Sequence, residues 1–191
     1  MSGTSLQRAV NLCLLAIGEA PVSTLEGAGP DAAAALAVIE RIKRAHLSEG
    51  WDYNTDEEFP FSPEGFSPYE IRIPDTVLSL RPTNPGLGLV LRGGRIFDLG
   101  RKTYSFQGIG ATHFTVVWNL EWDDLPETDR HLVATRSSRI FAQNMVGDGS
   151  IVQSLTRSEA EAEGLARRQA GRSSRPNMLL DSWSVARALR R

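Results

Sequence analysis

Side chains that could act on a substrate are concentrated in one short stretch, Glu121-Trp122-Asp123-Asp124. Two carboxylates that face each other across a groove can hydrolyse a glycosidic bond, and neighbouring carboxylates can bind a divalent cation. Adjacent acids in one loop do not by themselves face each other across a substrate. These acids precede a proline that favours a helix start, where the positive end of the helix dipole attracts negative charge. We therefore favour a structural role for them.

The other reactive residue types form no recognisable catalytic or metal-binding pattern. The histidines, His46, His113 and His131, lack the spacing of metal ligands. Cys13 lies in an apolar run and is predicted to be a buried core residue rather than a reactive thiol. The glycine-rich turns lack the lysine and hydroxyl residue of a phosphate-binding loop, and no Gly-x-Ser-x-Gly elbow occurs. We predict no enzyme activity, no cofactor and no bound metal.

Composition narrows the class of protein further. The chain has 191 residues, of which 41% are hydrophobic and 23% charged, as in a folded soluble protein. Its net charge of −2 argues against sequence-independent binding of nucleic acid, which needs a basic surface. Nearly all basic residues are arginines, since only Lys43 and Lys102 are lysines, and the stretch after Gly164 holds seven arginines against one acid, Asp181. Arginine suits carboxylate pairing at interfaces, although high genomic GC content would give the same bias. No apolar run approaches the roughly 18–20 residues that span a bilayer, and the N-terminus does not resemble a signal peptide.

Apolar residues three and four positions apart predict helices at both ends of the chain. The expected spans are Ser5 to Gly18, Pro30 to Gly50, Pro126 to Gly147 and about Ile151 to Gln169. Three side-chain orientations follow from the same spacing. Lys43 is expected on the solvent side of the second helix. Met145 and Val146 are expected on the apolar side of the third helix. The charged residues 159–163 are expected on a solvated or inter-subunit face of the fourth helix.

Between the helices, prolines and glycines become frequent and separate short runs of alternating polarity, which is typical of an antiparallel sandwich or barrel. The clearest hairpin is Arg92-Gly93-Gly94-Arg95, with Gly-Gly as a two-residue turn. The expected strands are residues 69–73, 76–80, 87–91, 95–99, 103–106 and 113–120.

The predicted fold is therefore α+β, with three parts. Residues 1–50 and 125–171 would form a four-helix bundle, residues 51–124 an antiparallel β domain, and residues 172–191 a docking tail. The apolar side chains of the tail could dock on its own domain or on a partner, and the sequence leaves both alternatives open. Trp51 lies at the helix-to-sheet junction, where it is expected to bridge the two parts.

Five stretches, in order along the chain, resemble the tail tubular protein A family of short-tailed, autographivirus-type bacteriophages. They are Ala16 to Gly27 (family pattern I-G-E-x-P-V-S-T-L), Gly50 to Asn54 (G-W-x-[FY]-N), Arg92 to Asp98 (R-G-G-x-[LIV]-[YF]-D), Leu125 to Phe141, and Asn177 to Leu179. The motif positions with an expected structural role are Gly18, Pro21, Leu25, Trp51, Gly93, Gly94, Pro126 and Arg139. Residues 59–68 and 81–88 depart from any family pattern that we can match.

The resemblance implies a structural protein of the virion tail, assembled in the bacterial host cytoplasm. Members form a ring, expected to be a dodecamer, between the portal protein and a nozzle protein similar to tail tubular protein B. The helical part would face the portal and the β part the nozzle, while DNA passes through the bore without specific binding and no membrane is involved. By the same analogy, the tail would contact the portal or a neighbouring subunit through Asn177, Met178, Leu179, Leu180, Trp183 and Leu189.

Two alternatives belong to other classes of protein. The first is a tail-associated hydrolase of envelope polysaccharide or peptidoglycan, which would need Glu121, Asp123 or Asp124 as its carboxylates. The second is a host-binding module whose β domain carries exposed aromatic side chains. Alanine substitutions of the acids would test the first, and labelling of intact against tail-stripped particles would test the second.

Overall fold

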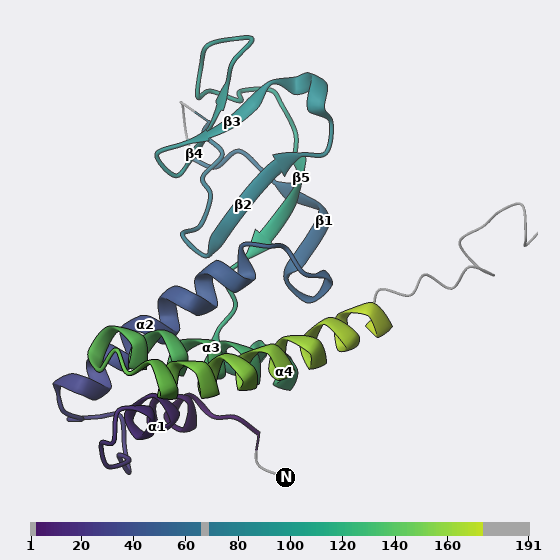
Figure 1. Ribbon diagram of the computed structural model, residues 1–191. Coiled ribbons are helices and arrows are strands. Elements are labelled where there is room, and N and C mark those ends of the chain that lie inside the picture. The colour runs from purple at the N-terminus through teal and green to yellow at the C-terminus, as the bar shows by residue number, and fades with distance from the viewer. Residues whose placement is uncertain (1–2, 66–68, 174–191) are drawn as a thin grey trace, which may run out of the picture. The chain divides into compact units, whose positions relative to one another are not determined.

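The computed structural model describes residues 3–65 and 69–173, which divide into two compact units (Figure 1). The first unit is drawn from residues 1–36 and 126–191, and the second from residues 37–125. The described residues contain four α-helices and two small antiparallel sheets, which confirms the predicted α+β class. The four-helix bundle, the sandwich or barrel, and the predicted domain boundaries remain predictions.

Helices α1 (Leu6–Ala16) and α2 (Pro30–Leu47) begin as the sequence predicts. The Ser5 hydroxyl caps α1 by accepting a hydrogen bond from the backbone N–H of Arg8 at 3.3 Å. In α2 the prediction for Lys43 is wrong, because this side chain is only 3% exposed. Its ammonium group lies 2.9 Å from a carboxylate oxygen of Glu40, one helical turn earlier. This ion pair offsets part of the cost of burying the charge.

Helices α3 (Glu127–Met145) and α4 (Gly149–Ser173) complete the first unit, where α1 and α4 both pack against α3 (Figure 1). Small side chains occupy several buried positions of α3, and small side chains at a contact allow two helices to approach closely. One of them, Ser138, donates a 3.2 Å hydrogen bond to the carbonyl oxygen of Leu12 in α1. On the α4 side, Leu132 is buried together with Ala162 and Ala166.

Two predictions about these helices need correction. Met145 and Val146 are each 50% exposed, so they do not belong to the apolar side of α3. Helix α4 begins at Gly149, two residues before the predicted start, because Asp148 caps it. A carboxylate oxygen of Asp148 accepts hydrogen bonds from the backbone N–H groups of Ser150 (2.7 Å) and Ile151 (3.3 Å). The hydrogen bonds from Ser150 lower the pKa of Asp148 below its ordinary value.

The second unit contains a three-stranded antiparallel sheet in the order β1-β5-β2 and a separate hairpin. The sheet consists of β1 (Thr55–Phe61), β2 (Val77–Pro82) and β5 (Thr112–Trp118), and the hairpin of β3 (Leu89–Arg92) and β4 (Arg95–Asp98). Short 3-10 turns occupy Asp52–Asn54 (η1), Pro85–Leu87 (η2) and Trp122–Asp124 (η3). One core joins the two sheets; its buried members are Phe61, Ile71, Ile73, Val77, Leu89, Ile96, Phe106, Phe114 and Val116.

The strand predictions fail at three places. β1 was not predicted, because its sequence Thr-Asp-Glu-Glu-Phe-Pro-Phe is acidic and contains a proline. Both features are tolerated there since β1 lies at an edge of its sheet. Residues 69–73 and 103–106 were predicted as strands, but they contribute only isolated bridges to neighbouring segments.

Candidate assembly surfaces

The first matched motif begins where α1 ends, at Ala16, and Gly18 follows two residues later. Its φ of +84° lies in the left-handed region that favours glycine. The backbone N–H of Gly18 donates to the carbonyl of Leu15 at 3.1 Å, and that of Glu19 donates to Leu14 at 3.0 Å. These two bonds form a Schellman motif, which satisfies the last carbonyls of the helix and turns the chain back.

The returning segment is held against α1 by two amide side chains that sequence reasoning missed. Asn11 pairs with both backbone groups of Val22: its carbonyl oxygen accepts from the N–H at 2.8 Å and its amide donates to the C=O at 3.0 Å. Gln7 donates to the carbonyls of Val22 (3.0 Å) and Ser23 (2.6 Å). Of the motif positions nearby, Pro21 is exposed and Leu25 is half-buried. The contacts of this motif thus shape the backbone that follows α1.

The second matched motif closes the end of α2 inside the second unit. The indole N–H of Trp51 donates to the carbonyl of His46 at 2.9 Å. The ring of Trp51 also packs against His46 and Tyr53, with centroid distances of 4.9 Å and 6.5 Å, and the Tyr53 hydroxyl lies 3.3 Å from Nε2 of His46. These contacts fix the turn that leads from α2 into β1.

Asn54, the last residue of that motif, connects three segments of the second unit. Its side chain is 1% exposed. Its amide nitrogen donates to the carbonyls of Leu47 (2.9 Å) and Trp118 (2.8 Å), and its oxygen accepts from the backbone N–H of Trp51 (2.7 Å). The end of α2, the start of β1 and the end of β5 therefore meet on one buried amide.

The third motif is the predicted hairpin, and the structure confirms it. Gly93 and Gly94 have φ values of +56° and +71°, as a two-residue type I′ turn requires, and Arg92 pairs with Arg95 across it. Ile96 behind the turn is fully buried.

The second residue of the fourth motif, Pro126, is the N-cap of α3 rather than its first residue. Next to it, the Glu127 carboxylate accepts hydrogen bonds from the backbone N–H of Thr4, at 2.8 and 3.0 Å, and from the Thr4 hydroxyl, at 2.7 Å. Burial acts to raise the pKa of Glu127, but these bonds and the nearby Arg130 outweigh it, so the pKa lies below its ordinary value. This motif ties the beginning of the described chain to α3.

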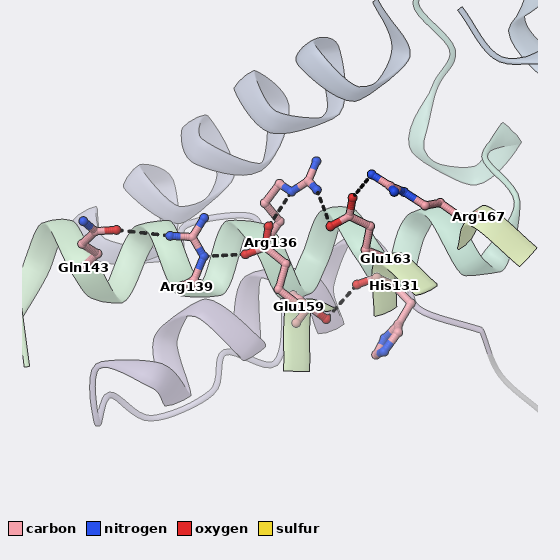
Figure 2. A network of polar contacts seen from close by, with 8 residues as sticks. His131, Arg136, Arg139, Gln143, Glu159, Glu163 and Arg167 are labelled. Carbon is pink, nitrogen blue, oxygen red and sulfur yellow. Dashed lines mark hydrogen bonds and ion pairs between the residues drawn. The ribbon is translucent and has the colours of Figure 1, made fainter. Parts of the chain in front are cut away.

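Arg139, also in the fourth motif, belongs to a network that connects α3 to α4 (Figure 2). Glu159 of α4 accepts hydrogen bonds from the guanidinium groups of Arg139 and of Arg136, the latter at 2.7 Å. Glu163, one turn later, lies 3.7 Å from Arg136 and 2.6 Å from Arg167. Glu159 and Glu163 thus point toward α3, and the expectation that residues 159–163 form a solvated or inter-subunit face is wrong for both.

The carboxylate of Glu159 is the central acceptor of this network, because both arginines of α3 donate to it. Its side chain is only 13% exposed. Burial acts to raise its pKa, but the hydrogen bonds and charges of Arg139 and Arg136 outweigh that effect and hold the pKa below its ordinary value. The arrangement keeps the carboxylate charged and paired. It is suited to fixing α4 on α3 and not to donating a proton to a substrate.

Comparison with known proteins identifies what these motifs belong to. A family model of tail tubular proteins matches residues 7–176, which include the second unit and most of the first. The chain belongs to the tail tubular protein family. A relative described as tail tubular protein A, from Klebsiella phage KP34, is 27% identical over 144 residues, which cover 74% of each chain. The resemblance found in the sequence is therefore confirmed, and the protein is a structural component of a bacteriophage tail.

In this tail tubular protein, the acidic stretch proposed for the hydrolase alternative forms the 3-10 turn η3. Glu121, Asp123 and Asp124 are exposed, while Trp122 between them is buried. Within the described residues, no group of three or more histidine, cysteine, aspartate or glutamate side chains is placed to hold a metal ion. Across the same residues, no helix combines the length and the hydropathy that a membrane span requires.

The remaining predicted residues belong to the tail. Residues 174–191 lie outside the described part of the chain, so the positions proposed as a partner interface stay a prediction. These are Asn177, Met178, Leu179, Leu180, Trp183 and Leu189.

Proposed function

We propose that this tail tubular protein is the adaptor that joins the portal of a short-tailed phage to the tail nozzle. Copies of the chain form a closed ring, expected to be a dodecamer, with a channel through which DNA leaves the particle. The observation that carries the proposal is the family match over residues 7–176, because it covers the second unit and most of the first. Ring formation, both partners and assembly in the host cytoplasm are parts of the proposal.

The physical character of the chain supports a passive channel. A head-to-tail contact repeated around a rotation axis closes into a ring when the rotation fits. A bore that conducts DNA must not bind it tightly, and a subunit of net charge −2 is suited to that because tight binding needs many positive contacts to phosphate. The matched motifs organise the backbone and the helix packing, as expected of a structural rather than a catalytic protein.

The direct test is to mix the purified chain with rings of the portal protein from the same phage and to separate the complexes by sedimentation. We expect the chain to move with the portal in a fixed ratio and in the absence of DNA. A chain that stays at the position of free protein at every concentration tested would contradict the proposal. Hydrolysis of purified peptidoglycan by the chain alone would favour the alternative enzyme.

A further inference from the structure

The outward face of the β3–β4 hairpin carries arginines held on aromatic rings. Opposite residues in an antiparallel pair point to the same side, and side chains alternate between sides along each strand. The pairs Arg92–Arg95 and Val90–Phe97 therefore share one face, while Ile96 points to the core. We call the outward group the hairpin face; its members are Arg72, Arg92, Arg95, Phe97 and Tyr104.

Two guanidinium groups of the hairpin face are stacked on these rings. The central carbon of the Arg92 guanidinium lies 4.4 Å from the ring centroid of Phe97, and that of Arg95 lies 4.5 Å from the centroid of Tyr104. Stacking occupies the flat side of a guanidinium and leaves its N–H edge available for a carboxylate. Such pre-orientation reduces the side-chain entropy lost when a partner binds.

The charge of this face is only partly balanced within the subunit. Glu70 accepts a 2.8 Å hydrogen bond from Arg95 and lies 3.8 Å from Arg72, whose side chain is 72% exposed. No carboxylate among the described residues pairs with Arg92. Glu64 is exposed and lies opposite Glu70 in an antiparallel bridge, so two acids against three arginines leave an excess of one positive charge on this surface.

A surface of opposite charge lies on β1 of the same unit. Asp56, Glu57 and Glu58 follow one another on this edge strand and are all exposed; we call them the acidic edge. Asp56 accepts a hydrogen bond from the indole of Trp118 at 2.8 Å, whereas Glu57 and Glu58 form no ion pair with any described residue. The strand pairing shifts between Asp56 and Phe59, and Glu58 has a φ of +57°, which is uncommon for a residue other than glycine.

Beside the acidic edge lies a groove of about 570 Å³, lined in part by Glu58, Leu87, Ile109 and His113. Leu87 is 46% exposed and Ile109 is 38% exposed, so the groove presents apolar surface next to negative charge. Charge flanking apolar surface is the usual composition of a protein–protein contact.

The hairpin face and the acidic edge belong to different parts of the second unit. β5 and β2 separate β1 from the hairpin, which packs beside β2 (Figure 1). No ion pair joins the two surfaces among the described residues. A head-to-tail ring needs two different surfaces on each subunit that are complementary to each other. We propose that the hairpin face of one subunit docks onto the acidic edge and adjoining groove of the next copy.

This inference rests on the proposed ring, and it specifies which surfaces hold the ring together. A second copy of the chain is favoured over DNA as the partner because the complementary acidic surface is present on the chain itself.

The test is a charge exchange between the two surfaces, measured as ring formation by native mass spectrometry with and without portal rings. The first variant carries Arg72→Glu and Arg92→Glu, and the second carries Glu57→Lys and Glu58→Lys. A matched control carries Asp75→Lys and Glu121→Lys, which change the charge by the same amount as the second variant at other exposed positions of the second unit. Circular dichroism spectra of all variants verify that they are folded.

Each variant alone should need at least about tenfold more protein to form rings, because like charges then face each other at every contact. An equimolar mixture of the two variants should recover ring formation, since every contact in an alternating ring again joins opposite charges. Alternation also requires an even number of subunits, as in the expected dodecamer. The control should form rings as the wild type does.

Two results would overturn the inference while leaving the proposed function intact. One is that both variants form rings at wild-type concentrations, and the other is that the mixture remains as defective as its folded components. Binding of the wild type to a short DNA duplex, lost in the first variant alone, would instead assign the hairpin face to nucleic acid. If the wild type forms no ring even on portal rings, the proposed function itself fails.

Discussion

Asn54 donates a 2.8 Å hydrogen bond to the carbonyl oxygen of Trp118, which lies 64 residues further along the chain. The same amide nitrogen reaches the carbonyl of Leu47, so one buried side chain connects the end of α2 to the end of β5. A helix terminus and the central strand of a sheet are thereby fixed to each other within the second unit. The position of β1, and with it the acidic edge, depends on this connection.

Replacing Asn54 by alanine should lower the free energy of unfolding by about 2–4 kcal/mol. The substitution removes three hydrogen bonds. The carbonyl of Leu47 keeps a 3.2 Å bond from the Gly50 N–H, whereas the partly buried Trp118 carbonyl and Trp51 N–H lose the Asn54 side chain at a cost of about 1–3 kcal/mol per group. Urea denaturation followed by fluorescence measures the change. Asn84→Ala is the matched control, because that exposed amide only accepts a bond from the nearby Gly86 N–H and its loss should cost less than about 1 kcal/mol. Equal effects of the two substitutions would refute the role assigned to Asn54.

Trp51→Ala should lower the melting temperature by several degrees, because it removes the ring that packs against His46 and Tyr53. Loss of this half-buried side chain is expected to cost about 2–3 kcal/mol, less than the roughly 3–5 of a fully buried tryptophan. Trp51→Phe keeps an aromatic ring and loses only the hydrogen bond to His46, so it should cost about 1 kcal/mol. An unchanged melting temperature for Trp51→Ala would mean that the junction does not depend on this residue.

Arg139→Ala should destabilise the chain by about 1–3 kcal/mol, because it removes a charged partner from the partly buried Glu159 carboxylate. The matched variant Arg167→Ala removes an arginine that is 74% exposed, and it should cost less than about 0.5 kcal/mol. Chemical denaturation of both variants at neutral pH compares them. If both substitutions lowered the free energy of unfolding by the same amount, the α3–α4 network would stabilise the chain no more than an exposed ion pair does.

The same network should make stability depend on pH in one direction. The pKa of Glu159 is lower in the folded chain than in the unfolded chain, so the unfolded state binds more protons at acidic pH. The paired Glu159 carboxylate contributes its full stabilisation above the pKa that it has in the unfolded chain. This contribution is lost as the pH falls through the lower pKa that Glu159 has in the folded chain. The stability gap between wild type and Glu159→Gln should therefore be largest at pH 7 and shrink below about pH 4.5. A gap that stays constant down to pH 3 would contradict the pairing.

Cys13 should be unreactive in the folded protein, since it is fully buried and burial raises its pKa to about 12. At pH 8 almost none of this thiol is ionised, and the thiolate is the form that reacts with iodoacetamide. Mass spectrometry should find the thiol unlabelled in buffer and fully labelled in concentrated urea. Rapid labelling in buffer would show that α1 is not packed as described.

Much of the fold follows from local sequence signals. The helix spans, the Gly93-Gly94 hairpin and the burial of Cys13 depend on periodicity and turn chemistry, which act over a few residues. β1 escaped prediction because its acids and proline are unfavourable in a central strand and acceptable only at an edge. Whether a strand lies at an edge depends on the complete sheet, which no local pattern reveals.

The same limit applies to the polar side chains that hold the motifs in place. Glu159 looks like one of several solvated acids, and its role depends on two arginines twenty or more residues earlier in the chain. Asn11 and Gln7 likewise look like ordinary surface residues of a helix, and only the returning loop gives them partners. The motifs were recognisable from sequence, but the contacts that stabilise them were not.

Deletion of residues 176–191 tests the proposed docking tail separately from the ring. Because the described residues of both units precede this segment, the shortened chain should fold with an unchanged melting temperature. We expect it to lose attachment to portal rings in the sedimentation assay. A variant with Leu179 and Trp183 both replaced by alanine should show the same loss without shortening the chain. Full attachment of either variant would contradict the docking role of the tail.

The most direct measurement of the central claim is an electron-microscopy reconstruction of the intact phage particle that contains this chain. The account predicts a ring of density, built of two-unit subunits, directly beneath the portal and above the nozzle, with an open channel on its axis. The ring should have twelvefold symmetry, and both units of each subunit should fit the density. A portal in direct contact with the nozzle, with no density for this chain between them, would contradict the account.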